Sequence, residues 1–171
     1  MLPSLPDDAR LWLFAADRAL SSEEQTALLS RMSAFIAGWT SHGRPVPAEA
    51  ALLHGRIVAV GASLAEGEVN AGVSGCGIDS LQHALDDAAA QVGVGWLSGL
   101  NVLFRDDGGT IQALSRPAFR RLAKDGLVTT ETCVFDLTLD TAGALRTIGV
   151  ERPAGGSWHG RVFRLATPSV A

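Results

Sequence analysis

The order of the apolar segments constrains the fold of this chain more than any other feature. Residues 10–15 form a compact apolar run that is typical of a buried strand. A capping-box pattern over residues 21–25 predicts a helix, which continues as an apolar stripe at three- and four-residue spacing. Residues 48–53 and 56–61 read as two strands of a hairpin, because the His-Gly pair between them tolerates the positive φ of a tight turn.

A second helix and a further strand complete a recognisable order. The helix is expected to begin at Asp79 or Ser80 and to end near residue 92, and a strand follows at residues 101–104. The order is then β-α-β-β-α-β, which is the arrangement of ferredoxin-like folds. The remainder, which is predicted as a C-terminal αβ extension, comprises a strand at 110–114, a helix that begins at Ser115, and strands at 132–139 and 160–165. With no repeat and no linker, we predict one α+β domain over residues 1–171.

Composition and charge narrow the class of protein. The chain has 171 residues, of which 47% are hydrophobic and 19% charged, values typical of a globular domain. A net charge of -4 offers no overall attraction to nucleic acid or acidic membranes, and the apolar run at residues 11–16 is too short for a signal or a membrane span. Two cysteines make a poor disulfide framework. We therefore predict a cytoplasmic protein whose partner is a small molecule or another protein, with self-association left open.

A glycine-flanked cysteine marks the first candidate site. Cys76 lies between Gly75 and Gly77, directly before the predicted helix start. Backbone amides and a partial positive charge gather at such a position, which suits a reactive thiol or a contact to a small ligand. If a right-handed crossover joins the neighbouring strands, this loop lies at a strand's carboxyl end, where α/β folds bind ligands. We predict ligand contacts from Gly75, Gly77, Asp79 and Ser80. The alternative is an inert cysteine buried in a tight turn.

A polar and aromatic cluster near the C-terminus supplies the second candidate site. It has the sequence Ser-Trp-His-Gly-Arg at residues 157–161 and follows a glycine-rich loop. A Cys76–His159 pair would suit nucleophilic catalysis, with Asp79 or Asp136 orienting the imidazole. Trp158 and Arg161 are the expected ligand contacts. The alternative is that the tryptophan packs at the edge of the core and the histidine is a solvated strand residue.

The second and third predicted helices each have a charged face, and exposure of these faces to solvent explains the charges better than a metal or nucleic-acid site does. Asp79, His83 and Asp86 or Asp87 share one face of the second helix, but no paired metal-ligand spacing accompanies them, so no metal and no cofactor are predicted. The basic stripe of the third helix consists of Arg116, Arg120, Arg121 and Lys124. It has no aromatic interleaving and lies in a chain of net negative charge, so we expect no nucleic-acid partner.

Several segments together resemble one bacterial family. They are residues 8–18, 74–80, 101–105, 132–136 and 157–161, of which the Ser-Gly-Cys-Gly-Ile-Asp-Ser element at 74–80 is the most specific. The chain resembles a family of small uncharacterised bacterial proteins that is often catalogued as "ABC transporter ATPase". The resemblance implies a bacterial origin but no established activity. The label itself does not fit, because the sequence lacks Gly-x4-Gly-Lys-Ser/Thr and its one lysine, Lys124, lies in Ala-Lys-Asp-Gly.

Three functional hypotheses follow from the sequence. The first is a small-ligand or partner-binding domain with its site at residues 75–80. The second is a cysteine-dependent hydrolase or transferase that uses Cys76 as nucleophile and His159 as base. The third is a structural or assembly protein. The sequence leaves open whether the protein is an enzyme, apart from excluding a P-loop ATPase.

Overall fold

The computed structural model describes residues 1–41, 43–63 and 75–168, apart from the side chain of Cys76. The chain is a mixed α+β protein, as predicted, and divides into two compact units. The first unit comprises Met1–Trp96 and Leu139–Thr147, and the second comprises Leu97–Thr138 and Ile148–Ala171. Among the described helices, none has the length and apolar character needed to cross a membrane.

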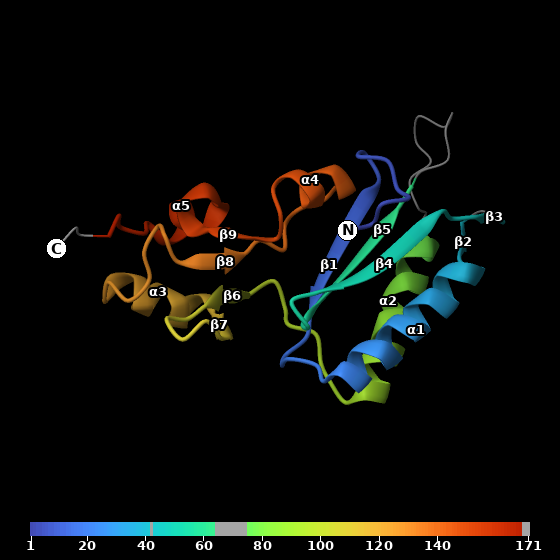
Figure 1. Ribbon diagram of the computed structural model, residues 1–171, viewed down its shortest axis with the longest axis horizontal. Helices are drawn as coiled ribbons and strands as arrows, with labels where there is room; N and C mark the ends of the chain where they lie inside the picture. Colours follow the sequence, from blue (N-terminus) through green and yellow to red (C-terminus); the bar gives the residue numbers. More distant parts are fainter. Residues whose placement is uncertain (42, 64–74, 169–171) are drawn as a thin grey trace. The chain divides into compact units, whose positions relative to one another are not determined.

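The first unit contains a three-stranded antiparallel sheet in the order β1-β5-β4 (Figure 1). Its strands are β1 (Arg10–Ala15), β4 (Ala48–Leu53) and β5 (Ile57–Ala62), and every residue of the central strand β5 is buried. Helices α1 (Ser22–Gly38) and α2 (Gly75–Val92) lie side by side against this sheet (Figure 1). The unit also holds the short strands β2 (Thr40–Ser41) and β3 (Arg44–Pro45) and the helix α4 (Ala142–Thr147).

Local sequence signals determine two features of the first unit as predicted. At the start of α1, the Ser21 hydroxyl accepts the Glu24 N–H at 3.3 Å, and the Glu24 carboxylate accepts the Ser21 N–H at 2.8 Å. The capping box is therefore confirmed. Between β4 and β5, His54 and Gly55 have φ values of 53° and 62°. The predicted hairpin is also confirmed.

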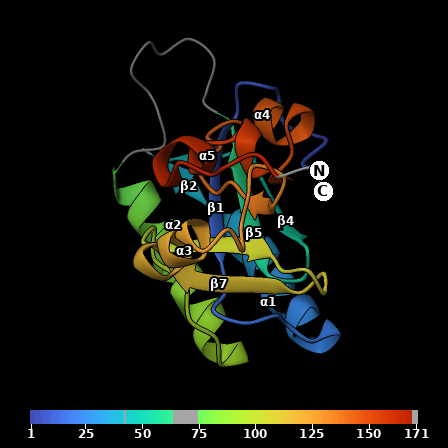
Figure 2. The same ribbon diagram turned by 90° about the vertical axis from the view of Figure 1, so that its left-hand side faces the viewer.

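The second unit contains a four-stranded antiparallel sheet in the order β7-β6-β8-β9. Its strands are β6 (Asn101–Arg105), β7 (Ile111–Ser115), β8 (Cys133–Phe135) and β9 (Glu151–Pro153). Its helices are α3 (Arg116–Lys124), the short 3-10 helix η1 (Ala154–Gly156) and α5 (Trp158–Phe163). Figure 2 turns the ribbon so that α3 and β7 face the viewer.

The core of the second unit is centred on one phenylalanine. Phe119 of α3 is fully buried, and its ring lies 5.3 Å from Phe104 of β6 and 4.8 Å from Phe163 of α5, both in edge-on geometry. Edge-to-face aromatic pairs at such separations are favourable beyond the area that they bury. Phe119 thus fixes both helices of this unit to its sheet.

Two predicted features differ from the observed fold. The ferredoxin-like core is not confirmed, because β5 and β6 belong to different sheets and the expected crossover within one sheet is not formed. The predicted strand at 160–165 is wrong, since these residues mostly belong to helix α5, whose N-cap is Ser157. The predicted strand at 132–139 is shortened to Cys133–Phe135. The division into two units does not test the prediction of one domain over residues 1–171.

Candidate ligand-binding site

The candidate site begins at the tight turn that leads from β9 into α5. The Ser157 hydroxyl donates to the Ala154 carbonyl at 3.0 Å and accepts the His159 N–H at 3.2 Å. These bonds satisfy a donor at the start of α5 that would otherwise have no partner. Gly160 lies so close to the turn that a Cβ there would be 2.7 Å from the Ala154 carbonyl oxygen. The turn therefore requires a glycine at this position.

His159 is buried directly behind this turn and is only 1% exposed. Its Nδ1 lies 2.9 Å from the Ser157 hydroxyl oxygen, and its ring stacks on Trp158 at 3.8 Å. Burial lowers the pKa of His159 to about 4, an effect that Asp136 opposes and Arg152 and Arg116 reinforce. The predicted base is therefore a neutral, weakly basic imidazole at pH 7.

A buried ion pair joins the ends of β8 and β9 beside the turn. Asp136 follows β8 and pairs with the guanidinium of Arg152, a residue of β9. The same carboxylate accepts the Thr138 hydroxyl at 2.6 Å and the Thr138 N–H at 3.1 Å. Burial raises the pKa of Asp136, but the bonds from Thr138 and Arg152 outweigh burial, so its pKa lies below the usual value. The charges of Asp136 and Arg152 thus cancel each other.

The turn and the ion pair line an open, shallow hollow of about 350 Å³. Its lining residues are Asp136, Thr138, Arg152, Gly155, Gly156, Ser157, Trp158 and Arg161. In the described parts of the chain, no carboxylate lies within ion-pair distance of the exposed Arg161 guanidinium. With Asp136 and Arg152 neutralising each other, Arg161 gives the hollow a net positive charge.

Two residues of this lining carry buried N–H donors that lack an acceptor. The Nε of Arg152 and the Nε1 of Trp158 are both inaccessible and have no hydrogen-bond partner among the described residues. The Arg116 guanidinium lies 5.1 Å from the Trp158 ring, and its Nε is unpaired in the same way. Most buried donors in proteins are paired, but these atoms are sealed from the hollow, so they are a feature of the surrounding packing and not contacts for a ligand.

The first predicted site has a different local structure from the one expected. Residues 75–80 are the first turns of α2 rather than a loop before it. Gly75, Asp79 and Ser80 are exposed, whereas Gly77 is buried and its carbonyl accepts the Trp39 indole N–H at 3.2 Å. The prediction of a ligand-binding loop at these residues is therefore wrong in its conformation. The side chain of Cys76 lies outside the described residues.

The structure brings some of the predicted site residues together. Trp158 and Arg161 both line the hollow, and His159 lies behind it on the same helix. Cys76 belongs to the first unit and His159 to the second. Pairing between the two stays a prediction, and so does the cysteine-dependent activity that requires it.

Sequence reasoning missed the partners that complete the hollow. Arg152 and Thr138 were not singled out, and Asp136 was considered only as an orienting group. Asp136 and Arg152 lie 16 residues apart and meet because β8 pairs with β9. One local signal was present, since a serine after two glycines is a typical helix N-cap and predicts α5 in place of a strand.

Within the described residues, no group of three or more histidine, cysteine, aspartate or glutamate side chains is arranged to hold a metal ion. Comparison of the chain with family models, with curated proteins and with solved structures gave no match in any of the three. The resemblance to the bacterial family therefore stays a prediction.

Proposed function

We propose that this protein binds a small carboxylate ligand in the hollow beside α5. The proposal keeps the predicted activity, small-ligand binding, and the predicted contacts Trp158 and Arg161. It moves the site away from residues 75–80, which are helical. The observation that carries it is a hollow lined by Trp158 in which the exposed Arg161 guanidinium is the one charge without an ion-pair partner among the described residues.

The charge and shape of the hollow favour a carboxylate over other small ligands. A guanidinium presents two parallel N–H groups that match the two oxygens of a carboxylate. One unpaired arginine balances one negative charge, so a monoanion fits better than a dianion. The volume of about 350 Å³ is at the lower end of the range for small-molecule sites, which points to a small ligand.

The test uses benzoate as the probe and NMR signals of the tryptophan indoles as the readout. A Trp158→Phe variant identifies the Trp158 indole N–H among the signals of the four tryptophans. Millimolar benzoate is expected to shift the Trp158 signal, because Trp158 lines the hollow and a bound aromatic ring changes the magnetic environment of its indole. Benzamide, which has the same shape without the charge, is expected to leave the signal in place.

Variants separate the site from general electrostatics. Arg161→Gln is expected to abolish the benzoate shift, whereas Arg121→Gln removes an exposed charge from α3 and is expected to preserve it. No shift with benzoate, or an equal loss of the shift in both variants, would contradict the proposal. We also propose, from the sequence, a cytoplasmic location and a bacterial origin.

A further inference from the structure

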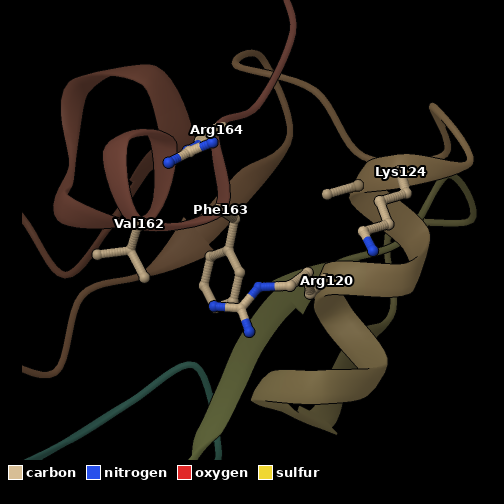
Figure 3. A pocket seen from close by; sticks show the side chains of 6 residues that line it. Arg120, Lys124, Val162, Phe163 and Arg164 are labelled. Atoms are coloured by element: carbon tan, nitrogen blue, oxygen red, sulfur yellow. The ribbon is translucent and has the colours of Figure 1, made fainter.

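A second pocket lies between α5 and α3 (Figure 3). It has a volume of about 400 Å³ and is lined by Arg120, Ala123, Lys124, Val162, Phe163 and Arg164. Figure 3 shows Arg120 beside the Phe163 ring, Lys124 farther along α3, and Arg164 at the end of α5. Three cationic residues from the two helices and their ends therefore line one pocket.

These three charges are not neutralised within the described chain. The Arg120 guanidinium lies 5.6 Å from the Phe163 ring centre, a cation–π contact that leaves its charge in place. No carboxylate within the described ranges forms an ion pair with Arg120, Lys124 or Arg164. The carbonyl ends of α3 and α5 each contribute roughly half a negative charge, which three full positive charges exceed.

The backbone at Arg164 is unusual for an arginine. Arg164 caps α5 with φ 53° and ψ 50°, the left-handed conformation in which glycine is the common residue. An arginine there costs stability relative to glycine, yet it contributes the third charge of the pocket. Side chains that are kept at an energetic cost are often found at functional positions.

We propose that this pocket binds the phosphate group of a small phosphate monoester. Near pH 7 such a group carries almost two negative charges on three oxygens, which suits three separate cations better than a carboxylate does. Val162 is 48% exposed at the rim, and with Ala123 it offers a small apolar contact to the body of the ester. The pocket is separate from the carboxylate hollow, and neither proposal depends on the other.

The chain's single lysine gives a direct readout. Reductive methylation with ¹³C-formaldehyde keeps the charge of Lys124 and labels only this side chain and the N-terminal amine. Phenyl phosphate is expected to shift the dimethyl-Lys124 signal with saturable binding. Phenyl sulfate has the same shape but only one negative charge, and is expected to bind at least about tenfold more weakly.

Two variants distinguish a binding residue from a structural one. Arg164→Gly is expected to weaken phenyl phosphate binding at least about tenfold while raising the urea midpoint, because glycine suits the left-handed cap. Arg121→Gln removes a charge from the same helix as Lys124 but does not line the pocket, and is expected to change affinity less than about twofold.

Three outcomes would overturn the proposal. They are the absence of a phenyl phosphate shift, equal affinity for phenyl sulfate, and equal weakening by Arg164→Gly and Arg121→Gln. Phosphatidylcholine vesicles that contain phosphatidic acid test the other source of a phosphate monoester. Binding to these vesicles without binding to phenyl phosphate would also count against a small soluble ligand.

Discussion

Three arginines of the first unit, Arg18, Arg56 and Arg146, are bound to backbone carbonyls, whereas those around α5 in the second unit line hollows. In the first unit, Arg56 donates to the Ala16 carbonyl at 2.9 Å, and Arg146 donates to the Leu2 carbonyl at 2.8 Å. In the second unit, Arg161 and Arg164 line hollows and form no ion pair within the described ranges.

The two units also differ in their balance of basic and acidic residues. The first unit has six arginines and twelve acidic residues, and the second has eight basic and six acidic residues. The overall charge of -4 therefore conceals a second unit with a surplus of positive charge. A cation that holds backbone carbonyls supports the fold, while an exposed cation at a hollow remains available to an anion.

The strongest test of this difference is a pair of arginine substitutions. Arg56→Met is expected to cost about 3 kcal/mol of unfolding free energy, because one buried and one partly buried carbonyl lose charge-assisted hydrogen bonds. These carbonyls belong to Ala16, at 2.9 Å, and Asp17, at 2.6 Å. Arg161→Gln is expected to change the free energy by less than about 0.5 kcal/mol, since its side chain is exposed. Urea unfolding at constant m-value measures both.

A comparable stability loss in both variants would remove the distinction between the units. Arg31→Gln is a suitable control, because Arg31 is an exposed arginine of α1 in the first unit. Arg31→Gln is expected to change the unfolding free energy as little as Arg161→Gln. Such a result would show that burial and carbonyl contacts, rather than membership of a unit, decide how much stability an arginine contributes.

Acid is expected to weaken the second unit before the first. His159 has a folded pKa of about 4 against an ordinary 6.5, so between these values the unfolded chain binds the extra proton. The contribution of the neutral His159 to the unfolding free energy is fully present above about pH 6.5. It is lost as the pH falls to 4, which lowers the unfolding free energy by up to about 3 kcal/mol. In the first unit, Arg18 and Ser21 lower the pKa of Glu24 to about 2, so its contribution is lost only below about pH 4.5.

Amide signals recorded along a pH series resolve the two units. Signals of α5 are expected to lose dispersion at higher pH than those of α1. His159→Gln should lower stability at pH 7 but flatten its decline between pH 6.5 and 4. A decline that is equally steep in this variant would show that another group controls the acid sensitivity.

Features that depend on a few neighbouring residues were predictable from the sequence. The capping box at Ser21 and Glu24 and the turn at His54 and Gly55 each need only local contacts. The partition of strands between two sheets was not predictable, because it depends on pairing between distant segments. Helix α5 was mistaken for a strand because Val162 and Phe163 are residues that favour strands. The close approach of Gly160 to Ala154 exists only in the folded turn.

In the candidate site, too, only the residues that are neighbours in sequence were predictable. Trp158, His159 and Arg161 are adjacent in sequence, so their clustering was visible. Their partners Asp136 and Arg152 are brought together by strand pairing. At Gly75 and Gly77, low helix propensity suggested a loop, but packing of α2, including the Trp39 bond to the Gly77 carbonyl, overrides it.

Two glycine substitutions are expected to have smaller effects than Arg56→Met, and they compare the two candidate sites. Gly160→Ala is expected to cost about 2 kcal/mol, because the new Cβ would meet a backbone carbonyl that cannot move independently. Gly75→Ala is expected to stabilise the protein by about 0.5 kcal/mol, since Gly75 is helical and a Cβ there meets nothing within 4 Å. Urea unfolding of both variants measures these changes.

The same pair also distinguishes the two sites by function. Because Gly160 holds the turn that lines the carboxylate hollow, Gly160→Ala should weaken the benzoate response, while Gly75→Ala should leave it intact. The reverse result, in which the alanine at residue 75 weakens binding and the one at residue 160 does not, would return the ligand site to the start of α2. In that case the uncompensated charge of Arg161 would be an ordinary solvated arginine, and the contrast between the units would concern stability alone.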